Sequence, residues 1–159
     1  MKVTPQYSRW WRRIQLKSRR VLENEELQMI SLFESLTGAT VKDCFLDPER
    51  RKVLFVVAEN QLGVALGRRG QKINKIRRIL GYNIDVVEEA KDDETFIRKL
   101  LSPARINYIK ITERGGQKIA YVSVDERDKG LAIGREGRNI NRVREIARIY
   151  RGIAHIKIM

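Results

Sequence analysis

Two short glycine-bounded sequences in this chain carry the residue types that bind phosphate. They are Gly67-Arg68-Arg69-Gly70 and Gly134-Arg135-Glu136-Gly137. Glycine lets the chain turn sharply and lets a ligand approach the backbone, while the helix expected after each loop presents its positive N-terminus. Arginines add positive charge at the same place. The chemistry that these residues could do is therefore anion binding, with phosphate as the expected ligand.

The two loops belong to a longer repeat in which equivalent residues are 67 positions apart. Residues 63–79 read GVALGRRGQKINKIRRI, and residues 130–146 read GLAIGREGRNINRVREI. Glycine, apolar and basic positions recur together, which a chance match does not preserve. The sequence therefore predicts one structural unit used twice.

Around each loop, hydrophobic periodicity and turn residues predict the order α-β-β-α-α-β. In the first unit we expect a helix from Asn24 that Gly38 ends, strands 41–46 and 53–57, helices 61–66 and 71–80, and a strand 83–87. In the second we expect a helix 94–101, strands 106–112 and 117–124, helices 129–133 and 138–150, and a strand 154–158. The predicted domains are 21–90 and 91–159, behind a basic, flexible N-terminal arm, 1–20.

Composition favours a folded protein with a polyanionic partner. The 159 residues are 42% hydrophobic, which is enough for a core, and the net charge is +13. Residues 1–20 hold seven basic residues and no acid, and residues 91–159 have a net charge of +7. Trp10, Trp11, Ile14 and Leu16 also leave room for a short amphipathic helix in the arm, on RNA, a protein partner or a membrane surface.

The sequence gives little support for a nucleotide-cofactor site, a catalytic site or a membrane-spanning segment. Neither loop has the Lys-Ser/Thr end of a Walker loop or the spacing of a Rossmann loop. His155 is the only histidine, and Cys44, the only cysteine, is expected to be a small buried hydrophobe in a reducing, intracellular protein. No apolar run is long enough to span a bilayer or to form a signal peptide. We expect a binding protein with no catalytic residue, metal or cofactor.

The repeated phrase resembles the KH domain in its type II arrangement. This resemblance implies an α+β fold (an α/β sandwich) of two tandem domains, each with a GXXG loop between two consecutive helices. KH domains clamp about four nucleotides of single-stranded nucleic acid. Two tandem copies with little else resemble the short archaeal form of the NusA-like transcription termination/antitermination factors. That family implies nascent single-stranded RNA and RNA polymerase as partners, a cytoplasmic location and a role in elongation and termination; we expect a monomer.

The resemblance also assigns roles to residues. It places both loops, named above, on the RNA backbone. Bases would lie in an apolar groove beside each loop, although each of its residues could equally be plain core: Ala65, Leu66, Ile73, Ala132, Ile133 and Ile140. Basic residues follow the loops on their helices, where a solvated helix face is the alternative: Lys72, Lys75, Arg138 and Arg142. Glu136 weakens the second loop unless it turns to solvent or pairs with Arg135 or Arg138.

Two other functions remain open at this point. A ribosomal or ribosome-assembly KH protein would bind ribosomal RNA through the same loops. A nucleotide-dependent phosphotransfer enzyme would use the glycine loops for a nucleoside triphosphate with magnesium.

Overall fold

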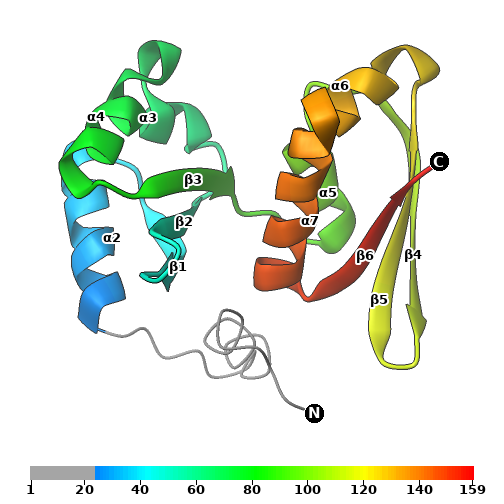
Figure 1. The fold of residues 1–159 in the computed structure, drawn as a ribbon, viewed down its shortest axis with the longest axis horizontal. Coiled ribbons are helices and arrows are strands. Elements are labelled where there is room, and N and C mark those ends of the chain that lie inside the picture. Colours follow the sequence, from blue (N-terminus) through cyan, green and yellow to red (C-terminus); the bar gives the residue numbers. More distant parts are fainter. Residues whose placement is uncertain (1–23) are drawn as a thin grey trace. The chain divides into compact units, whose positions relative to one another are not determined.

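The computed structural model describes residues 24–159, which divide after Glu89 into two units (Figure 1). The predicted arm, residues 1–20, lies outside the described residues.

Both units have the same order of elements. The first contains α2 (Asn24–Thr37), β1 (Val41–Asp47), β2 (Lys52–Val57), α3 (Leu62–Leu66), a 3-10 turn (Arg68–Gly70), α4 (Gln71–Leu80) and β3 (Asn83–Glu88). The second contains α5 (Asp93–Leu101), β4 (Ile106–Arg114), β5 (Gln117–Val124), a 3-10 turn (Glu126–Asp128), α6 (Lys129–Ile133), a further 3-10 turn (Arg135–Gly137), α7 (Arg138–Arg151) and β6 (Ile153–Ile158). This is the predicted α-β-β-α-α-β order, twice.

Each unit has one three-stranded sheet with its second strand in the middle. In the first unit, β2 pairs antiparallel with β1 and parallel with β3. In the second, β5 pairs antiparallel with β4 and parallel with β6. A parallel pair needs a crossover connection, and the two consecutive helices of each unit provide it. The loop between these helices is where each GXXG sequence lies (Figure 1).

Glycines end three helices, Gly38 as the sequence predicts, and an aspartate begins another helix one residue earlier than expected. Gly81 and Gly152 follow α4 and α7 in the left-handed conformation, and their N–H groups donate to carbonyls of the last turn. Gly38 ends α2 with a φ of 79°. The α5 helix begins after Asp92, whose side chain accepts a hydrogen bond from the Thr95 N–H at 2.7 Å.

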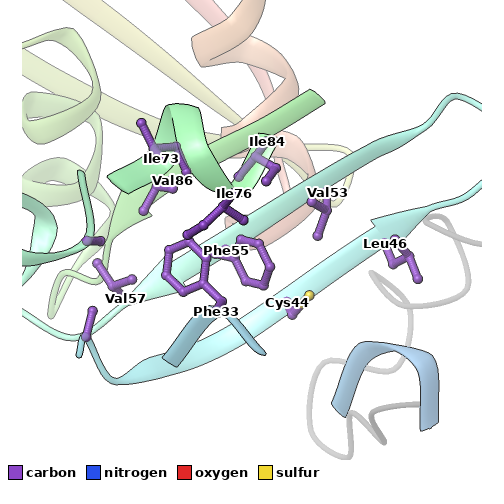
Figure 2. Close-up of a cluster of buried hydrophobic side chains, with 12 residues drawn as sticks. Phe33, Cys44, Leu46, Val53, Phe55, Val57, Ile73, Ile76, Ile84 and Val86 are labelled. Atoms are coloured by element: carbon purple, nitrogen blue, oxygen red, sulfur yellow. The ribbon is translucent and has the colours of Figure 1, made fainter. Parts of the chain in front are cut away.

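The core of the first unit lies between its sheet and its helices (Figure 2). Phe33 of α2 stacks on Phe55 of β2 with ring centroids 4.1 Å apart, and neither ring is exposed. Cys44 is buried in the same cluster, which confirms that its side chain is a small buried hydrophobe. The side chain of Leu27 in this helix is half-exposed. It lies in the first turn, whereas Phe33 lies further along the helix in the core.

Candidate nucleic-acid interface

The two GXXG loops have the same backbone conformation. Gly67 has φ 73° and ψ 177°, and Gly134 has φ 77° and ψ 173°. The third loop residue is left-handed in both, with φ 54° at Arg69 and 55° at Glu136. The second glycine, Gly70 in the first loop, is left-handed as well. The sequence repeat is therefore a repeat of geometry.

The glycine N–H groups of each loop donate to carbonyls of the loop itself and of the short helix before it. The Gly67 N–H donates to the Gly63 carbonyl at 3.0 Å, and the Gly70 N–H donates to the Gly67 carbonyl at 3.2 Å. The second loop repeats both bonds at its own glycines. Within residues 24–159, no hydrogen bond engages the N–H groups of Arg68 and Arg69. The amides that a ligand can use are therefore those of the two central residues, beside the start of α4.

The first glycine of each loop lies too close to the next helix to carry a side chain. A Cβ on Gly67 would be 2.8 Å from Cγ of Lys72. A Cβ on Gly134 would be 2.8 Å from Cβ of Asn139 and 2.9 Å from its backbone nitrogen. Such distances are shorter than ordinary van der Waals contact. The backbone of the loop is thus packed directly against the first turn of the helix that follows.

A side chain from that first turn ties each loop to the short helix before it. The Lys72 ammonium donates to the Thr37 carbonyl at 2.9 Å and to the Val64 carbonyl at 3.3 Å. Asn139, the equivalent residue, donates from Nδ2 to the Ala132 carbonyl at 2.8 Å. Lys72 was expected to face RNA. The structure gives two of its three N–H donors to the protein, so only one remains for a phosphate.

A second tie holds the other end of each short helix. Gln61 precedes α3, and its Oε1 accepts from the Thr40 N–H at 2.5 Å. Asp128 is the equivalent residue before α6, and its Oδ2 accepts from the N–H of Arg105 at 2.8 Å and from its Nε at 2.7 Å. The hydrogen bonds from the Arg105 side chain and backbone lower the pKa of Asp128 to about 2. Each loop is therefore anchored on both sides to its own domain.

The charged side chains differ between the two loops. Arg68, Arg69 and Lys75 are exposed, and no ion pair in the described part of the chain engages them. In the second loop, Glu136 lies 3.7 Å from an Arg138 guanidinium nitrogen, and both side chains are about three-quarters exposed. Arg135 is exposed, whereas Arg142 is partly buried and already has an interaction partner. The first loop thus offers more cationic groups to an anion.

Most of the apolar residues assigned to the groove are core residues. Ala65 and Ile73 are buried in the cluster shown in Figure 2, and their equivalents, Ala132 and Ile140, are buried too. Leu66 is partly buried, and Ile133 is 38% exposed. Ile133 therefore presents the most surface of the six to a base.

The sequence repeat contained an exposed apolar position that our prediction missed. Val64 and its equivalent Leu131 are 44% and 52% exposed, although each lies in the five-residue helix that leads into a loop. Each immediately precedes a buried alanine, and because consecutive residues of a helix point in different directions, the alanine meets the core while its neighbour reaches the surface. The recurrence of an apolar residue directly before the buried alanine was the available signal.

Two arginines at equivalent positions of the repeat form hydrogen bonds within the protein. Arg77 donates to the Ile84 carbonyl at 3.0 Å and to the Asn74 side chain at 3.0 Å. Its equivalent, Arg144, donates to the Ile156 carbonyl at 3.1 Å. The bonds to the carbonyls of Ile84 and Ile156 join the helix after each loop to the last strand of its unit.

Within residues 24–159, no group of His, Cys, Asp and Glu side chains could hold a metal ion. Among the same residues, no helix is long and apolar enough to cross a membrane.

Comparison with known proteins identifies the two units. The model of the KH domain family matches residues 28–116, and that of the NusA-like second KH domain matches residues 93–150. A probable transcription termination protein NusA from Methanococcus vannielii is 34% identical over 87% of this chain and 79% of its own length. One from Halobacterium salinarum is 36% identical over 79% of this chain and 88% of its own length. The chain belongs to the NusA-like family.

A solved structure agrees with this assignment. The crystal structure of APE1850 is 38% identical in sequence, with a TM-score of 0.77, over 87% of this chain and 100% of that one. Bacterial relatives are longer: the chain matches only 27% of the transcription termination/antitermination protein NusA from Thermus thermophilus, at 32% identity. The fold of two KH domains predicted from the sequence is thereby confirmed.

The close approach at the first glycine predicts unequal costs for two equivalent substitutions. Gly67→Ala and Gly134→Ala each place a side chain in a backbone region that only glycine adopts readily, at about 1–3 kcal/mol. Gly134→Ala should destabilise more, because its Cβ meets the backbone nitrogen of Asn139 rather than a side chain alone. Urea denaturation measures both. Gly63→Ala and Gly130→Ala are matched controls, since nothing lies within 4 Å of the added Cβ. Equal stability of Gly134→Ala and Gly130→Ala would contradict this account.

The hydrogen bonds to Asp128 predict an unusual titration. Its folded pKa of about 2 lies below the ordinary value of 3.8, so the tie is fully present above pH 3.8 and is lost as the pH falls through about 2. Carboxyl-carbon NMR should show this midpoint, and Arg105→Gln should raise it towards 3.8. Arg114→Gln, at the exposed end of β4, is the control and should leave it unchanged. An Asp128 that titrates near 3.8 in the unaltered protein would refute the tie.

Proposed function

We propose that this protein binds single-stranded RNA through its two GXXG loops and acts on nascent transcripts in transcription elongation and termination. The observation that carries the proposal is the shared geometry of the loops. Each presents two backbone N–H groups without an internal acceptor at the start of a helix, with arginine side chains beside them. This arrangement binds the phosphates of a flexible strand and requires no particular base.

The proposed mechanism is reversible capture of the RNA backbone. Gly67, Arg68, Arg69 and Gly70 form the first clamp, and residues 134–137 form the second. Lys75, Arg138 and Arg142 extend the positive surface along the helices, and Lys72 adds its one remaining donor. Bases contact Leu66, Ile133 and the exposed side chains of Val64 and Leu131, while the buried alanines and isoleucines support that surface from below.

The two clamps hold RNA with different strength in this proposal. The first has two arginines with no acid between them. In the second, Glu136 competes with phosphate for Arg138 and repels the RNA backbone. The weaker second clamp releases its part of the strand first, which suits a protein that must follow a moving transcript.

The link with transcription rests on the family. The curated relatives are described as transcription termination proteins, and the bacterial ones as termination/antitermination proteins. We propose RNA polymerase as the protein partner on that ground, and a cytoplasmic monomer that binds without catalysis. Crosslinking of RNA to this protein in cells distinguishes a role in transcription from binding of ribosomal RNA. Varied nascent transcripts support the role in transcription, and a single segment of ribosomal RNA contradicts it.

Charge reversal in the first loop should abolish most RNA binding. In the double variant Arg68→Asp/Arg69→Asp, two phosphate contacts are lost, so the slope of log K against log salt becomes less steep by about 1.4. Fluorescence anisotropy with a single-stranded RNA oligomer measures the affinity and the slope. Lys42→Asp/Arg78→Asp makes the same change in net charge at two exposed sites outside the loop. Equal losses in both variants would mean that net charge, and not the clamp, holds the RNA.

Removing the acid from the second loop should strengthen RNA binding. Glu136→Arg gives this loop the same central charge as the first and frees Arg138 from its ion pair. We expect a higher affinity and a salt slope that is steeper by about 0.7, as for one added phosphate contact. Glu113→Arg, at an exposed site on β4, is the control for the added charge. An affinity gain no larger than that of the control would argue against RNA at the second loop.

A further inference from the structure

The sheet of the second unit has one face against its helices and one face that no helix of this unit covers (Figure 1). Side chains alternate between the two faces along each strand. Ala120 and Val122 of β5 and Ile156 of β6 are at most 2% exposed and form the helix side. Tyr121 and Lys157 alternate with them along the same strands. These two residues therefore belong to the opposite side, which we call the outer face.

The outer face carries two tyrosines beside two lysines. Its central row, followed across β4, β5 and β6, consists of Lys110, Tyr121 and Lys157. Tyr108 lies two residues before Lys110 on β4, and its side chain is 52% exposed. Tyr108 is the diagonal neighbour of Tyr121 across the two strands, so their Cα atoms are about 7–8 Å apart. The two rings are thus close enough for neighbouring bases of one nucleic-acid strand to contact both.

The charge beside these tyrosines is positive. Lys110 and Lys157 are exposed, and no ion pair within residues 24–159 engages them. The Lys157 ammonium lies 5.6 Å from the centroid of the Tyr121 ring, so a cation stands beside the aromatic side chain. Glu113 of β4 pairs with Lys118, whose ammonium bonds to an α5 carboxylate at 2.9 Å. That row therefore belongs to the helix side of the sheet.

The first unit shows that the fold does not require this surface. Leu54 and Tyr121 are 67 positions apart, as the two loops are. The row of the first sheet that contains Leu54 reads Phe45, Leu54, Asp85. Phe45 and Leu54 are only 3% and 4% exposed, whereas Lys110 is exposed and Tyr121 partly exposed. The accessible tyrosines and lysines are therefore a property of the second unit alone.

This combination of side chains fits a single strand of nucleic acid better than it fits a protein surface. Bases stack on aromatic side chains, and basic side chains beside them track the phosphates. The centre of a protein interface, by contrast, is depleted of lysine. Here two lysines flank the central tyrosine, so a protein partner would remove two cations from water at the middle of the contact.

We propose that the outer face of the β4-β5-β6 sheet is a further RNA-binding site, separate from both GXXG loops. Tyr108 and Tyr121 stack on neighbouring bases, and Lys110 and Lys157 bind the phosphates beside them. The proposal rests on the proposed function, in that RNA is the ligand, and adds a surface that holds bases. The α7 helix, which follows the second loop, packs on the other side of this sheet. The second domain therefore has two separate surfaces for unpaired RNA.

Photocrosslinking tests this contact in the unaltered protein. A single-stranded RNA oligomer that carries 5-iodouridine crosslinks on irradiation to aromatic side chains stacked on its bases. Trypsin then releases Tyr108 in the peptide 106–110 and Tyr121 in the peptide 119–127. We expect crosslinks in both peptides. Crosslinks confined to the peptides of the two loops would overturn this site and leave the proposed function standing, whereas a protein that binds no RNA would overturn both.

Substitutions on the outer face measure each part of the contact. Tyr108→Ser should weaken binding of the same oligomer about 5-fold or more, as for one lost base stack, and Tyr108→Phe should preserve it because the ring remains. Lys110→Glu/Lys157→Glu should weaken binding and make the slope of log K against log salt less steep by about 1.4. Lys42→Glu/Lys91→Glu makes the same change in net charge at exposed sites off this face and should have a much smaller effect.

Circular dichroism and thermal unfolding establish that each variant is folded, and the crosslinked peptides decide the question if one is not. Equal affinities of folded Tyr108→Ser and Tyr108→Phe would contradict base stacking. Equal effects of the two double lysine variants would mean that net charge alone is responsible. A dimer of the unaltered protein that Tyr108→Ser abolishes, with RNA affinity unchanged, would assign the face to a second copy of the chain and refute the proposal.

Discussion

The candidate interface depends on the contact between the first loop glycine and the helix that follows it. Gly67 and Gly134 stand where a Cβ would be 2.8 Å from the first turn of α4 or α7. This approach fixes the path of the backbone, and with it the left-handed residues at Arg69 and Glu136. Because the glycine amides are used inside the turn, the two central amides remain for a ligand. The loop geometry that we propose for phosphate binding is thus a consequence of packing.

The fold supports this turn from both sides. Lys72 and Asn139 tie the helix after each loop to the helix before it. Gln61 and Asp128 tie the start of the earlier helix to the segment before the first strand. The residue types at these positions differ between the two domains, but equivalent hydrogen bonds form in both. A short helix of five residues has little stability of its own, which is why these tertiary ties are needed.

The two domains share geometry but differ in charge and in their exposed surfaces. The first has a purely basic loop and a sheet with buried apolar side chains on both of its faces. The second has an acid in its loop and an outer sheet face of polar and aromatic residues that meets water. Asp93 strengthens the second domain internally: burial opposes its ionisation, but hydrogen bonds from Lys118 and Arg151 outweigh it and lower its pKa. The two domains therefore share one loop geometry and differ in the charge beside it.

The sequence by itself determined the order of elements, the duplication and the loop positions, because periodicity, glycine punctuation and a repeat of 67 residues are local signals. It could not determine which residues beside the loops reach solvent. Ala65 and Ile73 are core, Val64 and Leu131 are exposed, and Lys72 is bound to carbonyls. Only the tertiary structure decided this, because burial depends on which faces of helix and sheet meet, and a basic side chain looks the same in sequence whether it binds phosphate or the protein's own backbone.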